Sequence, residues 1–172
     1  MRLPAGGIIR AEIPINMSEF KIREIEFMDS ASLLQLRNIE DDYKFYQNSA
    51  PVDCSDHENW VELRVKNRKK ITLVLEIDLH VMGVAYIDSL TKGEVAIRVN
   101  PRIRSQGWAK LLREELEKRV SQLNVSRLTA VVHKDNHNSI NFFLDGGYHV
   151  LQPEESDVFL RLEKNLTNVS IE

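Results

Sequence analysis

The sequence has little cysteine, and its glycine is dispersed. One cysteine, Cys54, is too few for an internal disulfide, which is typical of a reducing compartment. The seven glycines are scattered, and neither an internal repeat nor a low-complexity block interrupts the 172 residues. A chain of this length suits one domain with a core of its own.

The sequence also has no large excess of charge of one sign and no long hydrophobic run. The net charge is −3 and the sequence pI is about 6.0, so no overall basic field attracts a nucleic acid polymer. The apolar stretch near the N-terminus is interrupted by Arg10 and Glu12, which makes it too short for a signal peptide or a membrane span. We therefore expect a cytoplasmic protein without membrane insertion.

The apolar patterns divide the chain into three segments. Because Met17 resembles a second start, residues 1–18 are expected to be an extension without structure. A single domain is expected over residues 19–164, where the apolar patterns are regular. Residues 165–172 are expected to form a C-terminal tail.

Alternating and helical apolar patterns predict the order β-α-α-β-β-β-α-β-α-β-β. Strands are predicted at 20–27, 71–77, 81–88, 94–99, 127–132, 148–152 and 157–163. Helices are predicted after an N-cap at Asp29, from about Asp56 behind the capping-box pair Ser55 and Glu58, from Trp108, and over 138–147. Short breaks between consecutive strands indicate hairpins, and a later β-α-β crossover makes the sheet mixed and helix-covered.

A basic loop stands directly before the helix that begins at Trp108. Free N–H groups at a helix N-terminus, together with the positive end of the macrodipole, form an anion site. Gly107 permits close approach of a phosphate, and Arg102 and Arg104 add positive charge. The glycine spacings of NTPase and dinucleotide-binding loops are missing. From the residues alone, a diphosphate site and a solvated basic turn therefore both remain open.

Two motifs in this half of the chain resemble the GNAT superfamily of N-acetyltransferases. The first is Arg104-Ser105-Gln106-Gly107-Trp108-Ala109, similar to the family's [QR]-x-x-G-x-[GA]. The second is "DNHNSINFFLDGGY", from Asp135 to Tyr148. The resemblance covers essentially Phe20 to Lys164. It implies the α/β (α+β) GNAT fold: a mixed, mostly antiparallel central sheet of about seven strands, helices on both faces, and a slot where the fourth and fifth strands splay.

The resemblance implies acetyl transfer from acetyl-CoA to a primary amine in a ternary complex. The amides of Arg104–Ala109 would hold the pyrophosphate. Ile97 and Val99 on the fourth strand would pair with the pantetheine arm like an added strand. The other cofactor contacts would come from the second motif: Asn136, Ser139 and Phe143.

Acetyl transfer needs a neutral amine, a polarised thioester carbonyl and a proton for the leaving thiolate. Glu94 begins the fourth strand, where many relatives place a base that acts through water. Its alternative reading is a charged residue at a strand start. Asp88, at the end of the third strand, is a second candidate on the acceptor side. His133 and His137 straddle a strand end and a helix start, so we expect no metal site.

The general acid is the feature in which the sequence departs from the family. Many relatives carry a Tyr at the position of Phe143, which has no proton to donate. Asn136, Ser139 or water are alternative donors, or the thiolate leaves unaided, because a thiol pKa is only about 8.5. We expect Phe143 to contribute packing but no proton, and Tyr148 to fill the core.

The segment from Leu36 to Asn67 resembles the amino-sugar branch of the family, typified by N-acetyltransferases of the pseudaminic-acid pathway. The matching residues are Arg37, Asn38, Tyr46, Asn48, Ser49, His57 and Trp60. Acetyltransferases of ribosomal protein N-termini share the Arg-Asn pair and the Trp. Arg37 would bind a nucleotide phosphate and Trp60 would stack on a sugar or base. Their alternative readings are a helix-surface Arg and a core Trp.

Three functions therefore compete. The first is N-acetylation of a nucleotide-linked amino-deoxy sugar for a surface glycan or flagellar glycosylation in a bacterium. The second is acetylation of a protein N-terminus or another small amine. The third is a non-catalytic domain that binds acetyl-CoA. A homodimer stays open as the assembly.

Overall fold

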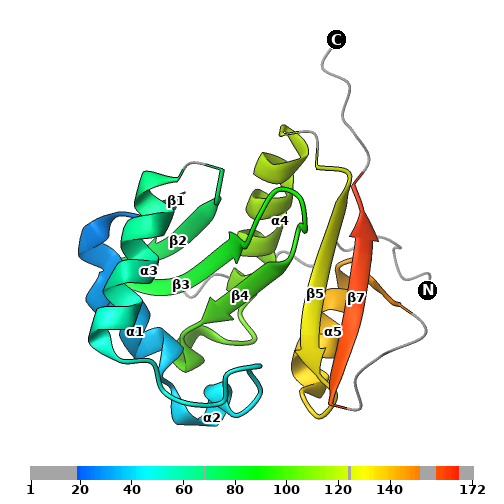
Figure 1. The fold of residues 1–172 in the computed structure, drawn as a ribbon, viewed down its shortest axis with the longest axis horizontal. Helices are drawn as coiled ribbons and strands as arrows, with labels where there is room; N and C mark the ends of the chain where they lie inside the picture. The colour runs from blue at the N-terminus through cyan, green and yellow to red at the C-terminus, as the bar shows by residue number, and fades with distance from the viewer. Residues whose placement is uncertain (1–18, 68, 124, 152–157, 167–172) are drawn as a thin grey trace, which may run out of the picture.

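The computed structural model describes residues 19–67, 69–123, 125–151 and 158–166. The expected N-terminal extension, 1–18, lies outside the described residues, as does most of the expected tail. Within them the predicted order of strands and helices is confirmed, except that a further short helix, α2 (Glu40–Tyr43), lies between the two helices predicted before the second strand (Figure 1). The elements are β1 (Phe20–Glu24), η1 (Phe27–Asp29), α1 (Ser30–Arg37), α2 (Glu40–Tyr43), α3 (Cys54–Lys66), β2 (Thr72–Ile77), β3 (His80–Ile87), β4 (Val95–Val99), η2 (Pro101–Ile103), α4 (Trp108–Ser121), β5 (Arg127–His133), α5 (His137–Asp145), β6 (His149–Val150) and β7 (Phe159–Asn165).

The strands form two sheets instead of one continuous sheet. Strands β1 to β4 pair in that order, all antiparallel, and the second sheet has the order β5-β7-β6. Among the described residues the two sheets are joined by one parallel bridge, between Glu94 and Thr129. Beyond this bridge β4 and β5 diverge, as Figure 1 shows. The predicted α/β fold with a splay between the fourth and fifth strands is thus confirmed, with the seven strands split into four and three.

Helices cover both faces of the first sheet, which explains why every residue of β2 is buried. Because side chains alternate along a strand, β2 and β3 contribute to two different cores. On one face α1 and α3 pack with Leu33, Leu36 and Val61 against Val74 and Val84. On the other face α4 packs with Leu112 and Leu116 against Leu73, Leu75 and Ile87. The second core continues beneath α5 to the β5-β7-β6 sheet.

One predicted helix start differs from the structure, and a second agrees in position but lacks the expected side-chain cap. Helix α3 begins at Cys54, and its N-cap is Asp53, whose carboxylate accepts a hydrogen bond from the Asp56 amide at 2.8 Å. The predicted pair Ser55 and Glu58 already lies inside the helix. Asp29 stands before α1 but makes no side-chain cap, because its buried carboxylate is occupied by the Arg23 guanidinium, at 2.7 and 2.8 Å. The same carboxylate also accepts from the Glu26 amide at 2.8 Å, so it serves Arg23 and the η1 turn and not α1.

In the part of the chain that is described, no helix is both long and apolar enough to cross a membrane.

Candidate active site

The loop between β4 and α4 presents a row of backbone amides. Gly107 is the N-cap residue with φ of 89°, and Ser105 also has a positive φ, 60°. The first hydrogen bond within the helix runs from the Leu111 amide to the Gly107 carbonyl at 3.1 Å. The amides that precede Leu111 in α4 therefore point out of the helix end, where its macrodipole is positive. This geometry suits an anion such as a diphosphate.

Most side chains of this loop make contacts within the protein. Arg104 forms an ion pair with Asp42 of α2 and reaches the Val99 carbonyl at 3.4 Å, so it ties the loop to the α2 segment. Gln106 donates to the Arg102 carbonyl at 3.2 Å. Trp108 is 2% exposed and packs in the core, and the exposed Phe20 meets its ring edge-on. The loop thus offers its backbone amides to an anion, and Trp108 contributes its amide and not its ring.

The open edge of β4 carries the polar groups of Ile97 and Val99. The Asn100 amide donates to the Met82 carbonyl of β3, and the Asp88 amide donates to the Glu94 carbonyl. The backbone N–H and C=O groups of even-numbered residues in β4 therefore point toward β3. Because the direction of these backbone groups alternates along a strand, the N–H and C=O groups of Ile97 and Val99 point away from β3, toward β5. An extended ligand in the splay would find the N–H and C=O groups of Ile97 and the N–H of Val99 in strand register, while the Val99 carbonyl accepts from Arg104 at 3.4 Å.

A cavity of about 640 Å³ fills the splay between β4, α4 and α5. Its wall includes the α4 loop, the edge of β4, Tyr46 behind α2, and Asn136 and Ser139 at the start of α5. Asn136 is the N-cap of α5, where its Oδ1 accepts from the Ser139 amide at 3.2 Å. Phe142 is the aromatic residue of α5 in this wall.

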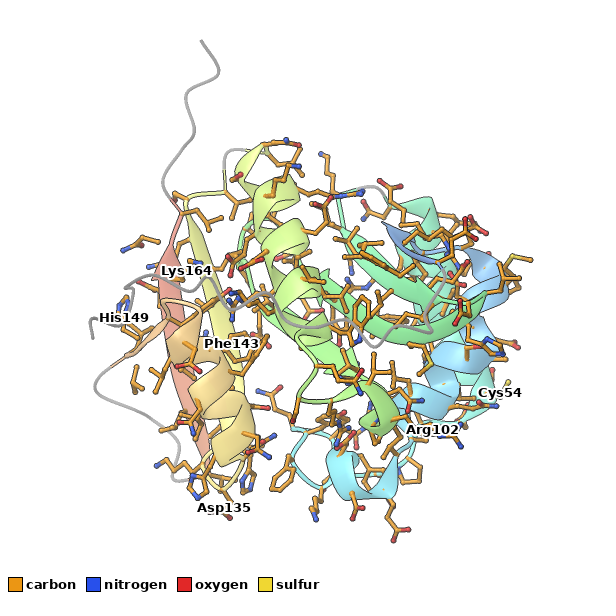
Figure 2. All side chains as sticks on the ribbon, turned by 180° about the vertical axis from the view of Figure 1, so that it is seen from behind. Cys54, Arg102, Asp135, Phe143, His149 and Lys164 are labelled. Atoms are coloured by element: carbon orange, nitrogen blue, oxygen red, sulfur yellow. The ribbon has the colours of Figure 1, made fainter. Side chains whose placement is uncertain are left out.

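Phe143 does not lie in the wall, which corrects its expected place among the cofactor contacts. The ring is 6% exposed and packs edge-on against Phe142 and Tyr148, with ring centroids 5.2 and 5.0 Å away. Figure 2 shows it on the side of α5 that faces the middle of the molecule. Helix periodicity is the reason, since neighbouring positions on α5 point about 100° apart. Phe143 therefore packs the core, as does Tyr148.

A second cavity, of about 390 Å³, lies between α1, α3 and the faces of β3 and β4. It is lined by Leu33, Arg37, Asn48, Pro51, Val52, Asp53, Asp56, His57, Trp60, Val84, Tyr86 and Arg98. Of the described residues, Arg98 alone lines both this cavity and the one in the splay. The two cavities therefore meet at the Arg98 side chain.

Aromatic rings hold the cations of this second cavity. The Arg98 guanidinium lies 4.5 Å from the Tyr46 ring centroid and 5.7 Å from that of Tyr86. Arg37 also stacks on Tyr46, at 4.5 Å, and its Nη2 donates to the Asn48 carbonyl at 2.9 Å. Such cation–π contacts are stronger where water is excluded. Both guanidinium groups are thus fixed in place before any ligand arrives.

With this geometry in place, a family model decides the identity: the Acetyltransferase (GNAT) family model matches residues 33–148. The chain belongs to this family. It is an N-acetyltransferase by family, and the splay between β4 and β5 is the feature that its sequence motifs predicted. No curated protein matches the chain.

Solved structures agree with this fold. A ribosomal-protein-alanine N-acetyltransferase from Brucella melitensis has a TM-score of 0.73 at 22% identity, over 85% of this chain and 99% of that one. A GNAT acetyltransferase from Streptococcus pneumoniae has 0.72 at 18%, over 87% and 100%. A phosphinothricin acetyltransferase from Sinorhizobium meliloti, in complex with acetyl-CoA, has 0.71 at 17%, over 86% and 88%. At such identities the likeness shows the fold alone.

The expected acceptor residues of this GNAT chain separate into three groups. Arg37, His57 and Trp60 line the second cavity, and Tyr46 lies in the wall of the splay. Asn38 lines neither cavity. Its amide group exchanges two 2.8 Å hydrogen bonds with the backbone of Val52, so it holds the loop that follows α2.

Trp60 is packed by protein groups on several sides. His57 stacks on it with ring centroids 5.4 Å apart, the Arg64 guanidinium lies 4.9 Å from its centre, and Tyr86 meets it edge-on. Only part of the ring remains for a ligand in the cavity. Trp60 is therefore packed on several sides like a core residue, and the rest of its ring faces the cavity as a binding residue would.

The two carboxylates considered as bases line neither cavity. Glu94 is half-buried at the bridge that closes the splay. Asp88 is exposed and accepts from the buried Arg64 at 2.7 Å. His57 does line the second cavity: its Nε2 is buried without a partner, and its pKa is lowered by burial and by the charges of Arg98 and Arg37. A neutral imidazole is able to accept a proton.

Arg98 and Tyr86 are the site residues that the sequence did not indicate. Arg98 stands in an apolar alternating strand, where a charged residue usually points to water. Cys54, in contrast, is exposed far from α5 (Figure 2), and its hydrogen bond to Glu58 raises the pKa of the thiol. That shift argues against a nucleophile at Cys54. Among the described residues no three potential ligands gather as a metal site would require.

Proposed function

We propose that the protein transfers an acetyl group from acetyl-CoA to the primary amine of a nucleotide-linked amino sugar, by direct attack in a ternary complex. The observation that carries direct transfer is the meeting of two cavities at Arg98. One cavity would hold the donor and the other the acceptor. The amine would then reach the thioester without a covalent enzyme intermediate.

The donor would lie in the splay. Its pyrophosphate would bind the amides of the Arg104–Ala109 loop, and its pantetheine arm would pair with Ile97 and Val99. Asn136 and Ser139 would contact the arm near the sulfur. The support for this arrangement is the outward direction of the loop amides and of the β4 edge.

For catalysis, we propose that Glu94 removes a proton from the ammonium group through water. A backbone amide near Val99 would polarise the thioester carbonyl, and the thiolate would leave unaided or take up, through water beside Asn136, the proton that the attacking nitrogen loses. His57 is a second candidate base, favoured by its unpartnered Nε2 in the acceptor cavity. The nitrogen lone pair then attacks the carbonyl carbon, and the C–S bond breaks.

The acceptor assignment rests on Arg37, whose buried Nη1 has no partner and faces a cavity that suits a phosphate. A protein N-terminus or a small amine is the second candidate acceptor. It is favoured by the modest volume of the acceptor cavity, about 390 Å³, which suits a compact group.

A single acceptor screen tests the function. CoA release would be followed with UDP-, GDP- and dTDP-linked amino sugars, N-terminal peptides and free small amines. Turnover with one nucleotide-linked amino sugar well above all peptides is the expected result. Preference for a peptide or a simple amine would overturn the sugar assignment. CoA binding without release under every condition would show a domain that binds acetyl-CoA and does not catalyse.

A further inference from the structure

Three buried nitrogen atoms of the acceptor cavity have no hydrogen-bond partner. They are Nη1 of Arg37, Nε of Arg98 and Nε2 of His57. Buried polar atoms are rarely left unpaired. The two guanidinium nitrogens are donors that an anion can satisfy, whereas Nε2 of a neutral His57 is an acceptor that suits the amine.

The two arginines also lack a counter-charge. Among the described residues, neither guanidinium has an ion-pair partner. The two carboxylates that line the cavity are Asp53 and Asp56, and Asp53 is occupied as the N-cap of α3. Burying an unpaired cation is unfavourable. Neither Asp53 nor Asp56 is ion-paired with these guanidinium groups, so an anion bound between them would supply the missing counter-charge.

The two cations stack on one ring, which sets an upper limit on their separation. Each guanidinium carbon lies 4.5 Å from the Tyr46 ring centroid, so the two carbons are at most twice that distance apart. An anion hydrogen-bonded to both would span this gap, since each charge-assisted bond is about 2.7–2.9 Å long. The Asn48 carbonyl fixes Arg37, and the Tyr86 hydroxyl, 3.4 Å from Nη2, borders Arg98. The donors need no reorganisation on binding.

We propose that the acceptor carries an oxyanion, a carboxylate or a phosphate, close to its amine, and that Arg37 and Arg98 bind this group. The proposal rests on the direct transfer described above but not on the nucleotide sugar. Because Arg98 lines both cavities, an anion bound to it lies beside the point of transfer. Purely cationic amines would meet two positive charges there, so we expect polyamines to be poorer acceptors than anionic amines.

The first test measures anion binding without turnover. Inorganic phosphate and acetate would be titrated separately into the protein while the His57 imidazole is followed by NMR. A bound anion offsets the charges of Arg37 and Arg98, which lower the His57 pKa, so that pKa should rise on binding. Arg37→Gln should weaken anion binding about 10- to 100-fold, as expected for a charged hydrogen bond. The control Lys118→Gln removes an exposed charge on α4 and should leave binding unchanged.

The second test compares amines in matched pairs. A 1-phosphorylated amino sugar would be paired with the free sugar, and an amino acid with its amide. The anionic member should have the higher kcat/KM, and Arg37→Gln should abolish this preference by lowering kcat/KM for the anionic member about 10- to 100-fold more than for the neutral one. The pair with the larger preference distinguishes phosphate from carboxylate.

The outcomes separate this inference from the assigned acceptor. If nucleotide-linked sugars fail but another anionic amine is acetylated, the sugar assignment falls and the inference stands. If nucleotide-linked sugars are acetylated equally well by Arg37→Gln, the inference falls. The absence of any anion-induced change at His57 in the unaltered protein would overturn it as well, whatever the acceptor screen gives.

Discussion

The two cavities that meet at Arg98 are built in different ways. The cavity in the splay offers mainly backbone: loop amides ahead of α4 and the free edge of β4. The acceptor cavity offers side chains from α1, α3, β3 and β4, held by ring stacking. A backbone site depends on chain geometry and tolerates most changes of side chain. A side-chain site is specific, and it changes with single substitutions.

The largest expected effect tests whether the base is Glu94, at the bridge that closes the splay, or His57 in the acceptor cavity. Glu94→Gln keeps the shape of the residue and removes the proton acceptor, so kcat should fall about 10²- to 10⁴-fold. His57→Gln is the matched variant in the acceptor cavity. The pH profile of kcat for both variants is the measurement. If Glu94→Gln keeps full turnover while His57→Gln loses it, the base belongs to the side-chain cavity.

Gly107→Val would disrupt the cavity in the splay, where the binding groups are backbone amides. A β-branched residue resists the φ of 89° found at Gly107, and its side chain would stand where a phosphate approaches. We expect CoA affinity to fall at least about 100-fold, as for the loss of two charged hydrogen bonds. Isothermal titration with CoA measures this, with circular dichroism as the check of folding.

The neighbouring Gln106→Ala is the control for the loop. It removes only a side-chain bond to the Arg102 carbonyl, so CoA affinity should hardly change. Equal losses in Gly107→Val and Gln106→Ala would mean that side chains, and not the backbone, bind the pyrophosphate.

Asn136 combines a cap with a polar contact in the splay, and two substitutions separate these roles. Asn136→Ala removes both and should cost about 1 kcal/mol of stability as well as activity. Asn136→Ser keeps a capping oxygen and should retain the thermal midpoint. A roughly tenfold loss of kcat in both variants is expected for one lost hydrogen bond. Full activity in Asn136→Ser would limit Asn136 to capping α5.

The smallest effect concerns the ion pair between Arg104 and Asp42. Asp42→Asn frees Arg104 from a competing carboxylate beside the pyrophosphate loop. An exposed pair is worth about 0.2–1 kcal/mol, so CoA should bind up to about fivefold more tightly at low salt. The gain should shrink as ionic strength rises. Weaker CoA binding in this variant would show that the pair positions the loop.

The backbone cavity was also the part that the sequence predicted best. Its loop and the start of α5 are contiguous segments, so short motifs report their geometry. The positive φ of Gly107 and the cap at Asn136 follow from residue type and position. Phe143 was misplaced because a motif position does not tell which face of α5 meets the ligand.

The acceptor cavity was predicted only in part. Arg37, His57 and Trp60 were found through resemblance, but Arg98 was missed because its burial depends on Tyr46 and Tyr86, which are distant in sequence. The four residues of α2 are too few for a helical period to show. Asn38 was assigned to substrate, although its amide group bonds to the Val52 backbone. Local patterns carry no information on such tertiary partners.

The single bridge between Glu94 and Thr129 has a consequence for handling the protein. Beyond it, β4 and β5 each present an edge, and unpaired edges invite pairing with another chain. A ligand seated along β4 would shield that edge, and at 100 times its Kd it would also add about 2.7 kcal/mol to the free energy of unfolding. We therefore expect bound CoA to keep the enzyme soluble. The ligand-free enzyme should aggregate during purification, and added CoA should reduce the loss of soluble enzyme.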